Sequence, residues 1–239
     1  MTPSVINKIS IVIPAFNEET RLGATLERTH SYCAERFDDF EIIVVDDGSR
    51  DSTAALVEKF AGPKPGVKLL KNGINRGKGF SVRRGILAST HEYALMTDAD
   101  LSTPIDELEK FLPYAAPDSV VIGSRGLKES NIVRHQPFYR EWMGKGFNLL
   151  VRLLVHRGIH DTQCGFKLFG PGAKKSVFPL LNVNGFAFDV EILVLAARKG
   201  LKIYEVPVVW SNDSQSKVHP LRDSLRMLRE IITIRLRHG

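Results

Sequence analysis

Short runs of aliphatic and β-branched residues alternate with longer amphipathic segments along the first half of the chain. These runs are nearly continuous in hydrophobicity, as in strands that are buried on both faces of a sheet. A turn signal or a charged residue bounds each run. We therefore predict strands at residues 9–14, 41–47, 67–72 and 93–100, and helices at residues 19–36, 51–60 and 77–89.

The second half of the chain has a mixed pattern. A predicted strand at 119–125 precedes a polar loop and a long amphipathic helix near 139–157, and further strands are predicted at 166–169 and 202–210. The fold class is therefore α/β, with a mostly parallel, doubly wound sheet and a mixed C-terminal half. Because no linker is visible, we expect one domain over residues 1–239, with halves at about 1–125 and 126–239.

Composition narrows the class of protein. The chain has 239 residues, of which 43% are hydrophobic and 25% charged, as in a folded enzyme-sized domain. Its apolar runs are shorter than the roughly 20 residues that span a bilayer, and its start lacks a signal-peptide pattern, so we expect neither spanning nor export. Cys33 and Cys164 are far apart, which predicts no disulfide framework, no zinc site and a reducing compartment. The net charge of +6 suits an anionic partner.

Acidic residues follow three of the predicted strands. In an open parallel sheet, ligands bind beyond the carboxyl ends of the strands. The carboxylates expected at that edge are Glu18, Asp46, Asp47, Asp98 and Asp100. Like charges this close require a cation, and Asp98 and Asp100 would point the same way if the segment were extended. Oxygen ligands without His or Cys favour Mg²⁺ or Mn²⁺, whose other ligands are usually water and substrate phosphate, although an isolated DxD more often caps a helix.

The glycine-rich stretch NGINRGKGFS at residues 72–81 lacks the spacing of a P-loop, and no GxGxxG motif opens the first helix. The pattern therefore favours neither an ATPase nor a dehydrogenase. Two interpretations remain open. The glycines form a plain turn into a helix, or Lys78 reaches a nucleotide phosphate or ribose.

The order of several motifs resembles the family 2 glycosyltransferases of GT-A fold, within them the branch that loads a sugar onto polyprenyl phosphate. These motifs are VIPAFNE, VVDDGSRDST, NRGKG, DADLSTP, GSR, DTQCGFKLF and FDVEIL. The last part of the chain is most similar to the dolichyl-phosphate β-glucosyltransferases. Mannosyl relatives usually read DPTSGFR and DADLQHP, and Ser102 stands here at the position of their glutamine. The eukaryotic glucosyltransferases begin with a membrane helix, which this sequence does not show.

The resemblance implies roles for individual residues. Those expected at the nucleotide are Pro14, Phe16, Glu18, Val45, Asp47, Lys78, Asp98, Ala99 and Asp100, of which Asp98 and Asp100 would hold the metal. Arg125 and Lys217, with the two aspartates, form the expected catalytic set and face the diphosphate and the acceptor phosphate. Those expected at sugar hydroxyls are Asp161, Gln163, Asp189 and Glu191. For Asp189 and Glu191, a solvated helix start is the alternative interpretation.

The expected reaction moves glucose from UDP-glucose to a polyprenyl phosphate with inversion. A phosphate monoester has its second pKa at about 6, so the acceptor is already dianionic and needs no general base. A mannosyltransferase using GDP-mannose is the alternative, as is an enzyme with a hydroxyl acceptor and Asp189, or else Asp161, as its base. A nucleotidylyltransferase would need a glycine-rich loop after Ile13. A nucleic-acid-binding module would not place carboxylates at its groove.

Basic residues gather at 134–157 and 222–237. In the first stretch aromatic residues lie among Arg134, Arg140 and other basic residues, as in interfacial helices, and these two arginines are expected at the acceptor phosphate together with Lys217. The second stretch repeats Leu221, Leu225, Leu228 and Ile232 along one helical face. We therefore expect a cytoplasmic enzyme that docks peripherally on the cytoplasmic face of a membrane. The alternative is that each apolar face packs on the sheet; for the second stretch both interpretations stay open, and for the first stretch we favour docking.

Overall fold

The structure is a computed structural model that describes residues 6–134, 158–212 and 220–238, the last range with side chains from Arg226 onward. Its strands are β1 (Lys8–Ala15), β2 (Asp39–Asp46), β3 (Val67–Lys71), β4 (Tyr93–Met96), β5 (Ser119–Ser124), β6 (Asn131–Arg134), β7 (Lys167–Phe169), β8 (Lys202–Pro207) and β9 (Val209–Ser211). Its helices are α1 (Leu22–Arg36), α2 (Thr53–Ala61), α3 (Lys78–Ala88), α5 (Pro171–Ser176), α6 (Phe188–Arg198) and α7 (Pro220–His238). Short 3₁₀ helices occur at η1 (Ile105–Lys110), η2 (Leu112–Tyr114) and η3 (Phe178–Leu180).

Seven strands form one sheet in the order β3-β2-β1-β4-β7-β5-β8. Strand β7 runs antiparallel to both of its neighbours, and the other pairs are parallel. Strands β6 and β9 form a separate parallel pair. The predicted α/β class is therefore confirmed: the sheet is mostly parallel and doubly wound, with a mixed C-terminal half.

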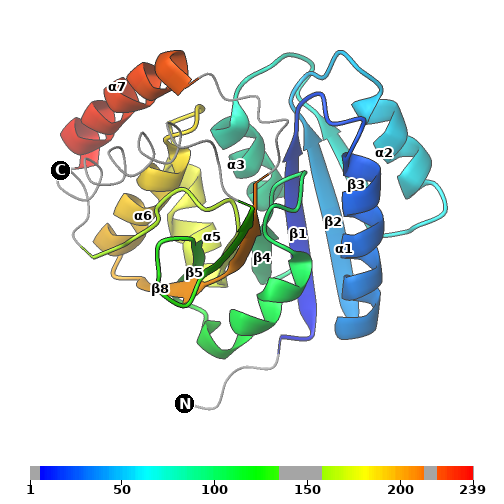
Figure 1. Ribbon diagram of the computed structural model, residues 1–239, viewed down its shortest axis with the longest axis horizontal. Coiled ribbons are helices and arrows are strands. Elements are labelled where there is room, and N and C mark those ends of the chain that lie inside the picture. The colour runs from blue at the N-terminus through cyan, green and yellow to red at the C-terminus, as the bar shows by residue number, and fades with distance from the viewer. Residues whose placement is uncertain (1–5, 135–157, 213–219, 239) are drawn as a thin grey trace.

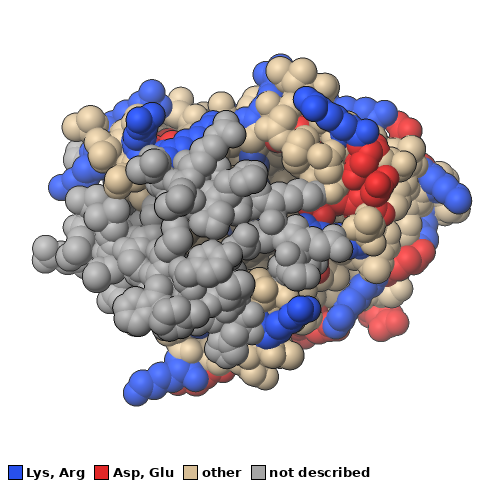
Figure 2. Space-filling view, turned by 45° about the horizontal axis from the view of Figure 1, so that its top comes forward, with Lys and Arg blue, Asp and Glu red and all other residues tan. Residues whose placement is uncertain are grey.

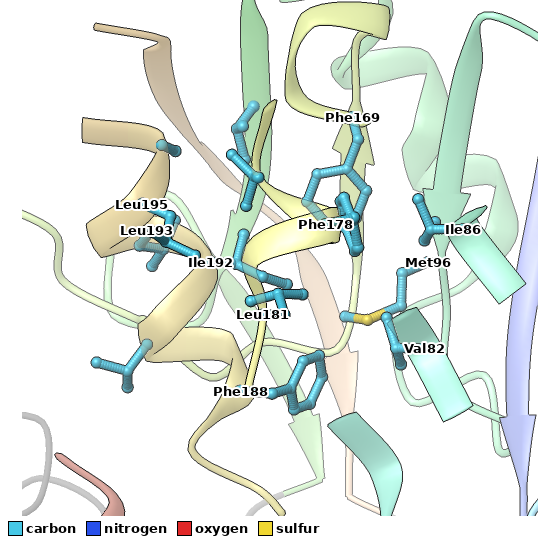
Figure 3. Packing of buried hydrophobic residues seen from close by; sticks show 14 of the residues in the cluster. Val82, Ile86, Met96, Phe169, Phe178, Leu181, Phe188, Ile192, Leu193 and Leu195 are labelled. Carbon is cyan, nitrogen blue, oxygen red and sulfur yellow. The ribbon is translucent and has the colours of Figure 1, made fainter. Parts of the chain in front are cut away.

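Helices cover both faces of the sheet (Figure 1). Because side chains alternate along a strand, Ile11 and Ile13 of β1 pack with α1, whereas Val12 packs with α3. Helices α1 and α2 lie on the first face and α3, α5 and α6 on the second, where α7 packs on α6. Figure 3 shows this second core, in which Phe188 at the start of α6 points toward Val82 of α3 and Met96 of β4.

Two predictions about the second half need correction. The single strand predicted at 202–210 is wrong, because the chain leaves the main sheet after Pro207 and continues as β9 in the second sheet. Proline has no N–H with which to continue a ladder, which explains the break. The predicted polar loop after β5 contains a strand, β6. The helix predicted near 139–157 lies outside the described residues.

Candidate active site

Strands β1, β2 and β4 run parallel, so their carboxyl ends meet at one edge of the sheet, at the top of Figure 1. The loops that follow them carry the predicted strand-end acids at residues 16–21, 47–53 and 97–104. Figure 2, in which the top of Figure 1 is turned forward, shows acidic side chains gathered beside basic ones. This edge is the candidate active site.

Asp98 and Asp100 lie in a turn and not in a strand. Strand β4 ends at Met96, and Leu101 has a φ of 46°, in the left-handed region that few non-glycine residues adopt. The backbone N–H of Ser102 donates to the Asp100 carboxylate at 2.9 Å, which closes this turn. The prediction that residues 98–100 are extended is therefore wrong, and strand alternation cannot be the reason why both carboxylates reach the edge.

Each of the two carboxylates lies beside its own basic side chain. Lys78 Nζ is 2.6 Å from Asp98 Oδ1, and Arg21 Nη1 is 3.7 Å from Asp100 Oδ2. Burial and the Asp98 charge raise the pKa of Asp100, while the Ser102 N–H and Arg21 oppose that rise. Burial disfavours a charged Lys78, but Asp98 and Asp189 outweigh it and raise the pKa of the lysine. These cations offset the repulsion between the two aspartates.

The oxygen atoms of Asp98 and Asp100 suit a hard divalent cation. Both side chains are partly exposed, at 33% and 20%. Within the part of the chain that the structure describes, no group of three or more His, Cys, Asp and Glu side chains gathers at a metal site. Two carboxylates alone leave most ligand positions of a cation to other groups. This fits Mg²⁺ or Mn²⁺, whose remaining ligands would be water and substrate phosphate.

A glycine makes room for Asp98. A Cβ atom on Gly165 would overlap the Asp98 carboxylate. Gly165 precedes β7, which is paired with β4. The glycine of the DTQCGFKLF motif therefore lets this segment approach the predicted metal ligand, a role that neighbouring residues in the sequence do not reveal.

Two other predicted nucleotide residues hold loops together. Asp47, which is buried, accepts hydrogen bonds from Asn72 Nδ2 at 2.7 Å and from the backbone N–H groups of Arg76 and Gly77, both at 2.9 Å. Glu18 is buried and pairs with both Nε and Nη2 of Arg21. The predicted nucleotide contacts of Asp47 and Glu18 stay predictions, and the structure adds that these carboxylates organise the loops on either side of the edge.

The remaining predicted nucleotide residues lie along the same edge. Pro14 and Phe16 are half-buried at the end of β1, and Val45 is fully buried in the core. Ala99 is buried, and its carbonyl oxygen accepts a hydrogen bond from Thr25 Oγ1 at 2.7 Å. Because the Val45 side chain is fully buried, any contact of Val45 with the nucleotide would involve its backbone.

Arg125 and Asp161 form a bidentate pair in which Asp161 is buried and the Arg125 side chain is 29% exposed. Arg125 Nε lies 2.6 Å from Asp161 Oδ2 and Nη2 lies 2.9 Å from Oδ1, while the Arg125 backbone N–H donates to the same carboxylate. The guanidinium also lies 5.4 Å from the Trp210 ring centroid. Burial alone would raise the pKa of Asp161, but Arg125 lowers it to about 2. The predicted contact of Arg125 with the diphosphate stays a prediction, as do those of Asp161 and half-buried Gln163 with the sugar. A substrate that contacts Arg125 or Asp161 would do so while the two side chains stay paired with each other.

The alternative of a solvated helix start for Asp189 and Glu191 is wrong, because both side chains are buried in α6. Asp189 Oδ1 is 2.6 Å from the ammonium of Lys167, a fully buried lysine on β7 that the sequence analysis did not single out. Glu191 accepts hydrogen bonds from the backbone N–H groups of Asn182 and Val183. Burial raises the pKa of Asp189, and Lys167 and Lys78 oppose that rise. The predicted sugar contacts of both acids stay untested.

The predicted acceptor residues are only partly described. Arg134 is exposed at the end of β6, where its carbonyl oxygen accepts the N–H of Asn212 at 3.0 Å. Arg140 and Lys217 lie outside the described residues. In the described ranges, no helix is both long and apolar enough to cross a membrane.

The fold matches that of solved structures. The structure of glucosyl-3-phosphoglycerate synthase from Mycobacterium tuberculosis in complex with Mn²⁺ and uridine-diphosphate-glucose superposes with a TM-score of 0.67 at 18% identity, covering 97% of this chain and 79% of that one. The fold is therefore that of the GT-A glycosyltransferases.

The model of glycosyl transferase family 2 matches residues 10–176, so the chain belongs to that family and is a glycosyltransferase. It is 39% identical to the dolichyl-phosphate beta-glucosyltransferase of Dictyostelium discoideum, covering 96% of this chain and 74% of that protein. It is 36% identical to the human dolichyl-phosphate beta-glucosyltransferase, covering 98% of this chain and 77% of that protein.

Proposed function

We propose that this enzyme transfers glucose from UDP-glucose to a polyprenyl phosphate, with inversion at the anomeric carbon and with a divalent cation held by Asp98 and Asp100. The observation that carries the proposal is the pair of partly exposed aspartates at the sheet edge, each beside a basic side chain. The names of relatives at 39% and 36% identity support glucose as the sugar and a dolichyl-type phosphate as the acceptor.

The donor diphosphate binds at the edge between Lys78 and Arg21. When bound, the cation offsets the charge that develops on the leaving nucleotide diphosphate. Lys78 and Arg21 lie beside the carboxylates that would hold this cation, so their positive groups can contact phosphate oxygens from the protein side. The half at about 1–125 thus binds the nucleotide, and the half at about 126–239 binds the acceptor.

The acceptor supplies its own nucleophile. A phosphate dianion attacks the anomeric carbon without a general base, provided that the protein holds it opposite the leaving group. The state of Asp189 supports this proposal over transfer to a hydroxyl, because its carboxylate is buried against the Lys167 ammonium and is poorly placed to accept a substrate proton.

A lipid-linked acceptor requires the enzyme to work at a membrane surface, which we propose is the cytoplasmic face. Helix α7 exposes Ile232 and Leu236, at 48% and 82%, together with several arginines. Figure 2 shows basic side chains on the α7 side of this face of the molecule. Basic residues near an anionic leaflet contribute about 1 kcal/mol each, so several arginines support reversible docking.

A parallel assay tests the proposal. Purified protein is given a polyprenyl phosphate with either UDP-glucose or GDP-mannose, in Mn²⁺ or in excess EDTA, and the glycolipid product is quantified. We expect product from UDP-glucose in Mn²⁺, and its loss in EDTA. Turnover of GDP-mannose instead of UDP-glucose would show that the enzyme is a mannosyltransferase. Sugar transfer only to a soluble hydroxyl acceptor would contradict the proposed acceptor.

Binding without turnover tests the donor separately. Ser102, which stands where mannosyl relatives usually have glutamine, lies two residues after Asp100, and its N–H closes the turn of the two aspartates. We expect calorimetry in Mn²⁺ to give tighter binding of UDP than of GDP. The reverse order would contradict the choice of donor.

A further inference from the structure

Residues 182–187, between η3 and α6, lie directly against the start of α3, where Lys78 is found. The Asn184 carbonyl oxygen accepts the backbone N–H groups of Gly79 at 2.8 Å and of Phe80 at 3.4 Å. A Cβ atom on Gly77 would overlap this carbonyl oxygen, and one on Gly79 would overlap the Val183 carbonyl oxygen. The glycines on either side of Lys78 therefore permit a close contact between the two segments, beyond forming a turn.

The same segment is held from its other side by α6. Glu191 is fully buried, and its Oε2 accepts the backbone N–H groups of Asn182 at 2.9 Å and of Val183 at 2.8 Å. Its Oε1 lies 3.1 Å from Nε2 of His238. A buried carboxylate is stable only when its oxygens are hydrogen-bonded, so Glu191 fixes the geometry of the segment.

Helix α7 contacts the segment through a second side chain. Glu230 Oε2 accepts the backbone N–H of Ala187 at 3.3 Å, and the Glu230 carboxylate fills the space that a Cβ atom on Gly185 would need. With His238, Glu230 gives the C-terminal helix two contacts with the structure around residues 182–187. From there the path continues through Asn184 to Gly79 and Lys78, whose ammonium contacts Asp98.

We propose that Glu191, Glu230 and His238 are positioning residues that hold Lys78 beside Asp98 through residues 182–187, so that α7 sets the affinity of the site for a nucleoside diphosphate. This inference rests on the proposed function, in which Lys78 contacts the donor diphosphate. Packing supports the same path, because the Lys78 ammonium lies 6.0 Å from the ring centroid of Phe188, the first residue of α6. Phe188 is fully buried against the core shown in Figure 3.

The test combines two measurements on the full chain: the Kd of UDP in Mn²⁺ by calorimetry, and hydrogen exchange of the Gly79 and Phe80 amides. Glu230→Ala should speed exchange at these amides. It should also weaken UDP binding about tenfold, as expected if Lys78 loses its hydrogen bond to the charged diphosphate. Gly79→Ala should act in the same direction. Glu58→Ala, on α2, and Gly62→Ala, directly after it, are the matched controls and should leave both measurements unchanged. The Glu58 side chain makes an exposed ion pair with Lys71, and a Cβ atom on Gly62 would make ordinary contacts.

Two further variants separate positioning from a general loss of structure. Glu230→Gln keeps an oxygen that can accept the Ala187 N–H and should restore UDP affinity. The double variant Lys78→Met with Glu230→Ala should bind UDP no more weakly than Lys78→Met alone, because both changes act through Lys78.

The outcomes distinguish this inference from the proposed function. If Lys78→Met weakens UDP binding while Glu230→Ala and Gly79→Ala do not, the positioning role is wrong and the donor site stands. Additive losses in the double variant would also overturn the positioning role. If Lys78→Met binds UDP as tightly as the wild type, the proposed contact of Lys78 with the diphosphate and the inference built on it both fail.

Discussion

Asp98 and Asp100 have different electrostatic environments although one residue separates them. Asp98 contacts Lys78 at 2.6 Å, whereas Asp100 lies 3.7 Å from Arg21 and accepts the Ser102 N–H. The turn at residues 98–101, rather than strand alternation, brings both to the edge. Their proposed role as metal ligands can therefore be tested by substitutions that keep the turn intact.

Asp100→Asn should lower turnover by on the order of 100-fold, since it removes a charge from the site at which negative charge develops. The asparagine oxygen can still accept the Ser102 N–H, so the free energy of unfolding should change little. Turnover with UDP-glucose and urea denaturation measure the two effects. Full turnover by Asp100→Asn, or by wild-type enzyme in excess EDTA, would contradict the metal assignment.

The Arg125–Asp161 pair allows a matched test of burial. Asp161→Asn should lower the free energy of unfolding by about 2 kcal/mol, less than for a fully buried pair, because the partly exposed Arg125 guanidinium can be hydrated after losing its carboxylate. Asp106→Asn is the control, since Asp106 pairs with Arg28 at 2.6 Å on the surface and its loss should change stability by less than about 1 kcal/mol. Equal urea midpoints for the two variants would show that the pair with buried Asp161 does not stabilise the fold.

At the scale of elements, α7 presents two apolar faces. Met227, Ile231 and Ile234 are buried in the core, whereas Ile232 and Leu236 are exposed. In the part of the expected stripe whose side chains the structure describes, Ile232 is exposed and Leu228 is only half-buried, so these two residues do not form the buried face. The helix both packs on α6 and leaves an apolar strip among exposed arginines.

Two substitutions separate these faces. Ile231→Ala should lower the free energy of unfolding by about 2–5 kcal/mol, the range for emptying a core isoleucine site. Leu236→Ser should change it by less than about 0.5 kcal/mol but should weaken binding to anionic liposomes. Chemical denaturation and liposome co-sedimentation at rising salt measure the two effects. Undiminished liposome binding by Leu236→Ser would remove α7 from the proposed docking surface.

For the whole molecule, two buried carboxylates link stability to pH. Burial opposes the charge of Glu41, but hydrogen bonds from Lys68, Ser10 and Thr90 lower its pKa to about 2, and Arg125 lowers the pKa of Asp161 to about 2. In the unfolded chain both groups titrate near pH 4. Their folded pKa values are depressed, so their contribution is fully present above about pH 5 and is lost as the pH falls toward 2.

We expect the two carboxylates to contribute about 2–3 kcal/mol each at neutral pH, which follows from shifts of about two pKa units. Urea denaturation at several pH values should therefore show stability falling between about pH 5 and pH 2. Glu41→Gln should remove part of this slope while lowering stability at pH 7. A slope equal to that of wild type would show that Glu41 titrates normally in the folded state.

The local pattern of apolar residues predicted much of the fold. Nearly continuous apolar runs predicted β1 to β5, because a strand buried on both faces needs apolar side chains in both directions. The predicted boundaries are close to those observed except at β4, which ends at Met96 and not at residue 100. The parallel order of these strands then predicted that the strand-end acids lie at one edge of the sheet. The family followed from ordered motifs, all but the last of which lie within the residues 10–176 that the family model matches.

The sequence by itself thus determined the mostly parallel sheet of the first half, the edge of the candidate site and the family. Only the tertiary structure decided which charged groups at that edge have protein partners: Asp47 with the 72–77 loop, Arg125 with Asp161, and buried Lys167 with Asp189. It also decided that residues 182–187 lie against Gly77 and Gly79. These partners are distant in the chain, and the geometry of a hydrogen bond or ion pair depends on where the packed elements place both groups, which no local periodicity encodes.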